Sequence, residues 1–125
     1  MLDTQLLLWA ASGGPDLPAA ALALINDPTR ELAFSAANIW EVVIKNSLGR
    51  HDFKVNPHIL RTRLVENGYA ELSISCEHML AVANLPNLHK DPFDRILIAQ
   101  AVVEGFTLLT ADAVIASYPG PIIRV

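Results

Sequence analysis

Short apolar segments alternate with longer helix-forming segments along almost the whole chain, and this alternation restricts the fold more than any other feature. The segments that predict strands are residues 1–3, 31–35, 69–75, 106–110 and 121–125. The segments that predict helices are residues 4–11, 17–27, 36–49, 56–68, 76–85, 92–105 and 111–118. Strands that alternate with helices are typical of an α/β sandwich built around a mainly parallel sheet.

Polar residues placed directly before the helical segments support this division of the chain. Ser35, Asn56, Ser75 and Asp91 each stand where a side-chain oxygen can cap the first turn of a helix. Proline follows Asn56 and Asp91 at the first helical position, where its missing N–H is not needed. We therefore expect helices to begin at these four sites.

The length and composition indicate one cytosolic globular domain. The chain has 125 residues, of which 52% are hydrophobic and 18% charged, so we expect residues 1–125 to fold as a single domain with a real core. Cys76 is the only cysteine, which excludes an internal disulfide and fits a reducing cytoplasm. The first apolar run lacks the basic flank of a signal peptide and is too short to cross a bilayer.

Four acidic residues lie at positions where a parallel α/β sheet would bring them together. Asp3 and Asp112 follow predicted strands, Glu41 lies in the helix after the second strand, and Asp94 lies in the first turn of the most hydrophobic helix. Ligands of such folds bind beyond the carboxyl ends of the strands. The apolar neighbours of Glu41 predict that this acid interrupts a mostly buried stretch: Ile39, Trp40, Val42, Val43 and Ile44.

Convergent carboxylates need a compensating charge. They repel one another and lose hydration, which raises their pKa values. A divalent cation with a preference for hard oxygen ligands, Mg²⁺ or Mn²⁺, is the natural compensation. Such an ion would also supply positive charge toward a polyanionic substrate, which a chain with a net charge of −4 otherwise lacks.

The two aspartates of the segment HKDPFDRILIAQAVVEG also have plain structural interpretations. Asp91 is well placed as an N-cap before Pro92. Asp94 falls at the third helical position, where the helix dipole favours an acid and a capping-box-like arrangement is possible. Helix-starting geometry and metal ligation are compatible, so both interpretations remain open for Asp94.

The other three acids have structural alternatives as well. Asp3 can be an ordinary turn residue, and Asp112 can cap the short helix that follows it. Glu41 and Lys45 are four residues apart and can form a surface ion pair on one helix face.

Four motifs in order give the chain a resemblance to a known family. They are LDTQLLLW near the start, SAANIWEVVIKNSLG in the middle, HKDPFDRILIAQA, and LLTAD near the end. With these motifs the chain resembles the PIN-domain family, and within it the VapC-type toxins of toxin–antitoxin pairs. HKDPFDRILIAQA is the most specific of the four, and the resemblance covers nearly the whole chain.

The resemblance implies a fold, an activity and partners. It implies a three-layer α/β/α sandwich with a central, mainly parallel sheet of four to five strands. It implies a Mg²⁺- or Mn²⁺-dependent endoribonuclease that hydrolyses RNA phosphodiester bonds with a metal-activated water. It also implies a small cognate VapB-type antitoxin that covers the acidic site, and a homodimer.

The resemblance also implies roles for individual residues. Asp3 and Asp94 would be direct metal ligands, whereas Glu41 and Asp112 would bind through water or hold a second ion. Thr110 and Thr4, which are hydroxyl neighbours of the acids, would support the site from behind the ligands.

The basic residues near this edge are candidates for contacts with phosphate. They are Lys45, Arg50, Lys90 and Arg95, and for each of them a solvated surface role is the alternative. The histidines lack metal-ligand spacing, and we expect loop or surface positions for all of them: His51, His58, His78 and His89. We expect Cys76 to be a small core residue.

Apolar stripes on residues 17–27 and 56–68 are candidate contacts for the antitoxin, although they can equally be ordinary core faces. Two other functional classes are alternatives to a nuclease. One is a catalytically inactive PIN-like module that only binds a protein partner. The other is a phosphotransfer domain, which is disfavoured because LDTQ lacks the second aspartate of a DxD loop.

Overall fold

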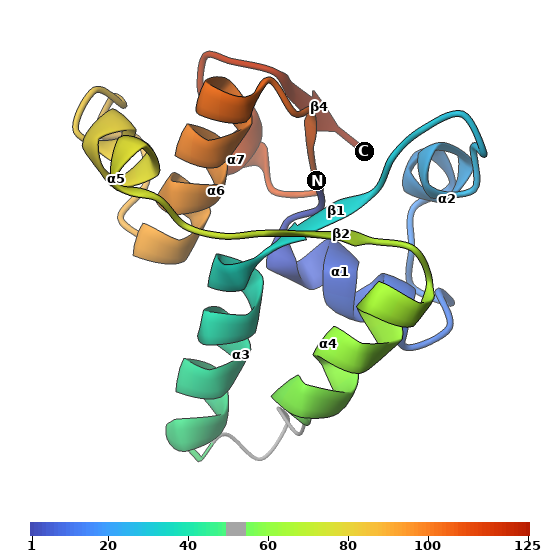
Figure 1. Cartoon of the computed structure of the whole chain (residues 1–125). Coiled ribbons are helices and arrows are strands. Elements are labelled where there is room, and N and C mark those ends of the chain that lie inside the picture. The colour runs from blue at the N-terminus through green and yellow to red at the C-terminus, as the bar shows by residue number, and fades with distance from the viewer. Residues whose placement is uncertain (50–54) are drawn as a thin grey trace.

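The computed structural model describes residues 1–49 and 55–125 and has the expected alternation of helices and strands (Figure 1). The helices in these ranges are α1 (Thr4–Ala11), α2 (Ala19–Ile25), α3 (Ala36–Ser47), α4 (Pro57–Glu66), α5 (Cys76–Val82), α6 (Pro92–Glu104) and α7 (Ala113–Ala116). The strands are β1 (Ala33–Ser35), β2 (Ala70–Leu72), β3 (Leu108–Thr110) and β4 (Ile122–Arg124).

The sheet is parallel but shorter than the sequence predicts. β1 pairs with β2 in parallel, with Phe34 opposite Glu71, and β3 pairs with β4 in parallel, with Leu109 opposite Ile123. Leu2 forms a single parallel bridge to Leu109, so the start of the chain lies beside β3. The α/β class is confirmed, whereas regular pairing in the described residues forms two two-stranded pieces in place of one continuous sheet.

Strand β1 ends early because its last residue also caps the helix that follows. Ser35, the last residue of β1, is also the N-cap of α3, and its hydroxyl accepts the Ala37 N–H at 2.9 Å. Backbone groups that enter a helix turn cannot continue a strand ladder. The predicted caps Asn56, Ser75 and Asp91 likewise accept N–H groups from the first turns of α4, α5 and α6, so all four predicted helix starts are confirmed.

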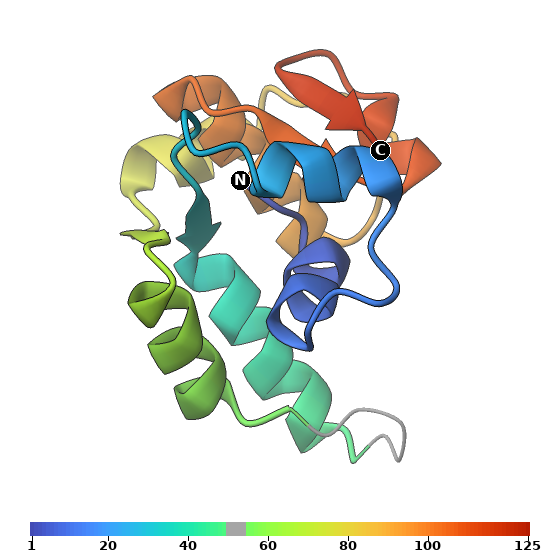
Figure 2. The same cartoon turned by 90° about the vertical axis from the view of Figure 1, so that its right-hand side faces the viewer.

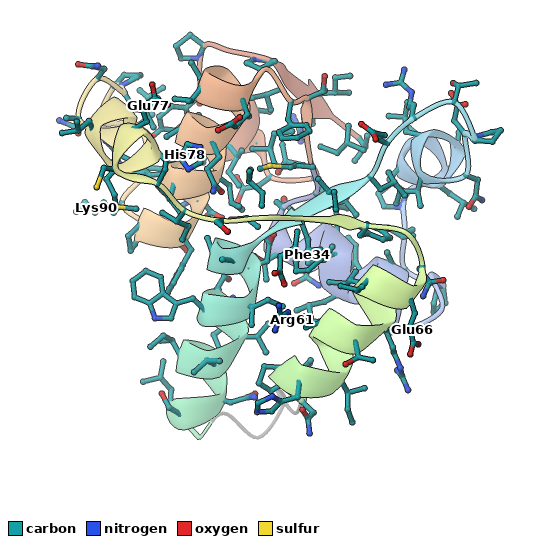
Figure 3. The ribbon with its side chains drawn as sticks, viewed as in Figure 1. Phe34, Arg61, Glu66, Glu77, His78 and Lys90 are labelled. Carbon is teal, nitrogen blue, oxygen red and sulfur yellow. The ribbon has the colours of Figure 1, made fainter. Side chains whose placement is uncertain are left out.

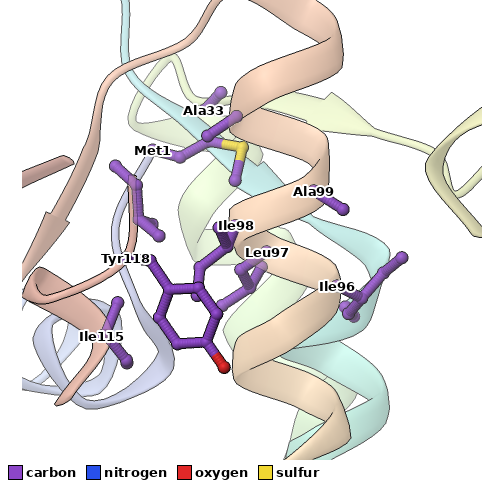
Figure 4. Close-up of a cluster of buried hydrophobic side chains, with 11 residues drawn as sticks. Met1, Ala33, Ile96, Leu97, Ile98, Ala99, Ile115 and Tyr118 are labelled. Carbon is purple, nitrogen blue, oxygen red and sulfur yellow. The ribbon is translucent and has the colours of Figure 1, made fainter. Parts of the chain in front are cut away.

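Two hydrophobic clusters form the core. The first surrounds α6, whose Leu97 and Ile98 pack with Leu108, Ile115 and Tyr118 (Figure 4). The second is centred on Phe34 and gathers the buried side chains of α1 and α4 together with Leu2 and Leu109 (the Phe34 side chain is labelled in Figure 3). The C-terminal Val125 packs against this second cluster, and Figure 2 shows that end of the chain beside α2.

Helix α5 presents a different face to the core from the one we expected, and two predictions were wrong for this reason. Cys76 is exposed, whereas His78 is only 1% exposed and points from α5 toward α6 (Figure 3). The His78 ring is tolerated inside because Nδ1 accepts the Ser75 N–H at 3.0 Å and Nε2 lies 2.8 Å from Glu104 Oε1. A buried polar group whose atoms all find partners loses little on leaving water.

None of the helices in residues 1–49 and 55–125 is long and apolar enough to cross a membrane.

Loss of the Leu97 side chain is expected to destabilise the protein strongly. Leu97 is 1% exposed in the α6 cluster, so Leu97→Ala should lower the free energy of unfolding by about 2–5 kcal/mol in urea denaturation. Leu80→Ala is the matched control, since Leu80 is 72% exposed on α5 and should change stability by less than about 0.5 kcal/mol. Equal effects of the two changes would contradict the assigned core.

Candidate active site

The four predicted acids line one pocket of about 340 Å³. Asp3 comes from the start of α1, Glu41 from α3, Asp94 from the first turn of α6, and Asp112 from the start of α7. Asp91, which the sequence predicted only as a helix cap, is a fifth acid in the same lining. A larger hollow of about 460 Å³ lies between α1, α2 and α4, but no carboxylate is among the described residues that line it.

Asp3 is held at both of its carboxylate oxygens. Oδ1 accepts the Leu6 N–H at 2.9 Å, which makes Asp3 the N-cap of α1, and Oδ2 accepts the Thr110 hydroxyl at 2.6 Å. Burial raises the pKa of Asp3, and the nearby Asp112 and Glu41 add to the rise, while the bonds from Thr110 and Leu6 oppose it. Asp3 is therefore a fixed carboxylate that pairs with no basic side chain among the described residues.

Thr110 connects two of the acids. Besides donating to Asp3, its Oγ1 accepts the backbone N–H of Asp112 at 3.0 Å. Asp112 is exposed, and its Oδ1 caps α7 by accepting the Val114 N–H at 2.7 Å. The structural role considered for Asp112 and its place in the pocket therefore occur together.

Asn38 is a supporting residue that the sequence analysis missed. Its Nδ2 donates to Thr4 Oγ1 at 2.9 Å, and its Oδ1 accepts the Ser35 N–H at 2.8 Å. This buried amide fixes the start of α3 against the start of α1, and so sets Glu41 relative to Asp3. The available signal was its position three residues after Ser35, where a capping-box partner belongs.

Only one of the two carboxylate oxygens of Glu41 has a polar partner among the described residues. It is 4% exposed, and its Oε2 lies 2.6 Å from Lys45 Nζ. Its Oε1 is buried and has no hydrogen-bond partner among the described residues. The predicted i, i+4 pair thus exists, but its acidic member is inside the protein and not on the surface.

The apolar neighbours of Glu41 are less buried than we expected. Trp40 is 51% exposed, and Val43 and Ile44 are also exposed, whereas Val42 is fully buried. Because successive helical residues point in different directions, the face that carries Glu41 and Val42 inward turns Trp40 and Val43 outward. The Trp40 ring makes an edge contact with Phe93 of α6, with 4.9 Å between ring centroids.

Asp94 has the most perturbed acidity of the cluster. Burial raises its pKa to about 7, and the charges of Asp91 and Glu41 contribute to the rise. His89 opposes the rise, and its Nε2 lies 2.9 Å from Asp94 Oδ2. The capping-box-like arrangement does not form, because the Asp94 carboxylate contacts His89, while Asp91 caps the helix.

Comparison with known proteins places the chain in a family. The sequence matches the family model of the PIN domain over residues 1–121. The chain belongs to the PIN-domain family. No curated protein matches it in a direct sequence comparison.

Solved structures share the PIN-domain fold along the full length of the chain. One is VapBC2 from Rickettsia felis bound to a DNA fragment from their promoter, with a TM-score of 0.72, 17% identity, and coverage of 100% of this chain and 97% of that one. Another is a toxin–antitoxin complex from Klebsiella pneumoniae, with a TM-score of 0.65, 20% identity, and coverage of 98% and 94%. The predicted PIN-like α/β fold is thereby confirmed.

The donor chemistry of this PIN-domain pocket fits a divalent cation bound partly through water. Its acids offer hard carboxylate oxygens, one of which, Glu41 Oε1, is buried without a partner. Among residues 1–49 and 55–125, however, no three acidic, histidine or cysteine side chains lie close enough to enclose one ion directly. Mg²⁺ commonly uses only one or two protein carboxylates and keeps several waters, so the open arrangement suits it.

The four candidate phosphate contacts differ in their surroundings. Lys45 lines the pocket beside Glu41, and Lys90 is exposed at the periphery of the molecule (Figure 3). Arg95 directs its guanidinium to the backbone carbonyls of Val82 and Pro86. Arg50 and His51 lie outside the described residues, and His58 is exposed as predicted.

Neutralising Asp94 is expected to stabilise the metal-free protein at alkaline pH. Between the ordinary pKa of 3.8 and about 7, the folded protein keeps a proton that the unfolded chain has released. The contribution of Asp94 to the free energy of unfolding therefore falls as the pH rises through this window. Asp94→Asn should raise the melting temperature at pH 8 in EDTA and weaken its dependence on pH.

Two variants make this prediction specific. Asp91→Ala should lower the melting temperature, because it removes a cap worth about 1 kcal/mol. Glu77→Gln changes an exposed acid on α5 and should have little effect at either pH. An unchanged or lower melting temperature for Asp94→Asn at pH 8 would contradict the assigned electrostatics.

Proposed function

We propose that this protein is a metal-dependent endoribonuclease toxin of a toxin–antitoxin pair. The observation that carries the proposal is the single pocket in which Asp3, Glu41, Asp94 and Asp112 meet, with raised pKa values for Asp3 and Asp94. Membership of the PIN-domain family and the likeness to two toxin–antitoxin structures support it. Strongly perturbed acids gathered in a cleft are typical of catalytic sites.

The cofactor in this proposal is Mg²⁺ or Mn²⁺, and the acids divide its binding among them. Asp3 and Asp94 hold it directly, and Glu41 and Asp112 hold it through water or bind a second ion. Asp3 suits direct binding because the Leu6 N–H and the Thr110 hydroxyl hold its two oxygens in place. Among the described residues, no basic side chain forms an ion pair with it. When bound, the cation would lower the pKa of a water and offset charge on the scissile phosphodiester.

The remaining residues of the pocket orient the substrate and support the acids. Thr4 and Thr110 anchor the N-termini of α1 and α7 through their hydroxyl groups. Lys45 offsets the charge of Glu41 and lies at the pocket, where an RNA phosphate would approach. Lys90, Arg50 and Arg95 remain predicted phosphate contacts, and the bonds of Arg95 to backbone carbonyls weigh against it.

A small VapB-type antitoxin is the protein partner in this proposal. Two adjoining hollows of about 460 and 350 Å³ lie beside α4 and share Ala11 and Arg63; the larger has a mixed polar and apolar lining, and the smaller is mainly apolar. They support a site for an amphipathic segment of a partner. The exposed apolar residues of α3 and of its C-cap, among them Trp40 and Leu48, support a homodimer. We place this function in the cytoplasm.

An inactive PIN-like binding module is the alternative, and metal binding separates the two. A nuclease should bind Mn²⁺ at one or two sites in calorimetry, and Asp94→Asn should weaken that binding. A module without catalytic function should show no specific heat of binding.

Cleavage of RNA is the direct test of the proposed activity. With structured RNAs and Mg²⁺ or Mn²⁺, the parent should cut and EDTA should stop it, while Asp94→Asn should reduce cleavage by a factor of at least about 100, the size of a lost metal ligand or its support. Circular dichroism should show that the variant is folded. Glu77→Gln changes an exposed acid in the first turn of α5, outside the pocket lining, and should cut like the parent (Figure 3). Cleavage by Asp94→Asn at the parental rate would refute the mechanism.

The antitoxin proposal predicts a stable complex with the product of the adjacent gene. Co-expression should allow the two chains to purify together, and the complex should cut RNA more slowly than the free protein. Ile59→Arg would place a charge on the exposed apolar surface of α4 and should weaken the complex. Glu77→Arg is the control on an unrelated helix. Separate migration of the two parental chains would refute this partner.

A further inference from the structure

The guanidinium of Arg95 is engaged with main-chain and hydroxyl oxygens, although its residue directly follows the candidate ligand Asp94. It donates to the carbonyl oxygens of Pro86 at 3.0 Å, Val82 at 3.2 Å and His89 at 3.4 Å. It also donates to the hydroxyl of Tyr118 at 3.1 Å. Arg95 thus ties the end of α5, the loop before α6 and the segment after α7 to one another.

Tyr118 provides a buried anchor for the same loop. Its ring is 4% exposed and packs in the α6 cluster, where Figure 4 shows it beside Leu97 and Ile98 with its hydroxyl at the edge of the cluster. That hydroxyl accepts the backbone N–H of His89 at 2.8 Å. Because a ring packed in the core has a fixed orientation, its hydroxyl is a fixed acceptor.

The main chain of His89 is therefore held on both sides, and its side chain reaches Asp94, which lines the pocket. Its N–H is bound to Tyr118, its carbonyl to Arg95, and its Nε2 lies 2.9 Å from Asp94 Oδ2. A continuous series of contacts runs from the hydrophobic core to a carboxylate of the candidate metal site. The carboxylate torsion of an aspartate is broad and poorly restricted by itself, so an outside contact is needed to fix its orientation.

We propose that Tyr118 and Arg95 are positioning residues that hold His89 against Asp94 and so fix the orientation of this carboxylate for metal binding. The inference rests on the proposed function, because it takes Asp94 as a metal ligand. Partners that hold a ligand from behind typically contribute a factor of about 10–100 to metal affinity. Neither Tyr118 nor Arg95 is among the described residues that line the pocket, so both act through His89.

Tyr118→Phe tests the proposal with the loss of one oxygen atom. The buried ring is kept, and the hydroxyl that accepts from His89 N–H and Arg95 and donates to the His89 carbonyl is removed. Mn²⁺ affinity measured by calorimetry should fall by a factor of about 10 or more, with the secondary structure unchanged. Tyr69→Phe is the matched control, since Tyr69 is buried in the other core cluster, and it should bind Mn²⁺ like the parent. Parental affinity in Tyr118→Phe would overturn the proposal.

A double-mutant cycle separates positioning through His89 from a general structural effect. His89→Ala removes the contact to Asp94 directly and should weaken Mn²⁺ binding by a similar factor. If Tyr118 acts through His89, Tyr118→Phe should cause no further loss in the His89→Ala background. Independent, multiplied losses would overturn the proposal. If Tyr118→Phe does not fold, Arg95→Gln takes its place in the same cycle, with the same two outcomes.

Hydrogen exchange distinguishes failure of this inference from failure of the proposed function. In the metal-free protein, Tyr118→Phe should speed exchange of the His89 amide by a factor of about 10 or more, whether or not the protein is a nuclease. Unchanged exchange would overturn the inference even in an active enzyme. A parent that binds no Mn²⁺ and cuts no RNA would refute the proposed function, and with it the metal-positioning role, even if the His89 amide behaved as expected.

Discussion

The crowding of five carboxyl groups around one pocket is the constraint on which the rest of the site depends, and helix N-termini make it tolerable. Asp3, Asp91 and Asp112 each cap a helix, so their oxygens accept backbone N–H groups and lie at the positive end of a helix dipole. Helices α1 and α7 begin here because the Leu2 bridge and β3 run in parallel and reach the same edge of the fold, whereas α6 is reached by the loop that follows α5.

The two acids that cap no helix, Glu41 and Asp94, each contact a basic side chain. Glu41 is paired with Lys45 at one oxygen and has a buried, unpartnered second oxygen, and Asp94 is paired with His89 yet has a pKa raised to about 7. Lys45 and His89 therefore partly offset the charge that a cation would neutralise. A cation bound as proposed would relieve the repulsion between the carboxylates and stabilise the folded protein, which is less stable without it.

The supporting residues of the pocket belong to elements that are far apart along the chain. Thr110 joins Asp3 to Asp112, Asn38 joins α3 to α1, and Tyr118 with Arg95 joins the loop before α6 to the segment after α7. Each contact is a hydrogen bond between buried or partly buried groups, where an unmade bond is costly. The geometry of the acids is thus tied directly to the packing of the core.

The sequence alone determined the order of helices and strands, the caps at Ser35, Asn56, Ser75 and Asp91, and the four acids that meet in the pocket. These features depend on local patterns, since capping side chains, helix-breaking residues and apolar periodicity act over a few residues. The family motifs depend on similarly short stretches of chain. The same patterns could not give the extent of the sheet, because β1, for example, ends at Ser35, whose N–H and hydroxyl both bond within the first turn of α3.

Only the tertiary structure decided which side chains support the acids and which faces are buried. His78 is inside and Cys76 outside because α5 packs against α6 by the face that carries His78, and Glu104 supplies the partner for its ring. Arg95 contacts carbonyl groups of a loop and not a charged partner, and Asn38 bridges two helix starts. These roles are set by contacts between residues distant in the sequence, and no local pattern records how two surfaces will meet when the chain folds.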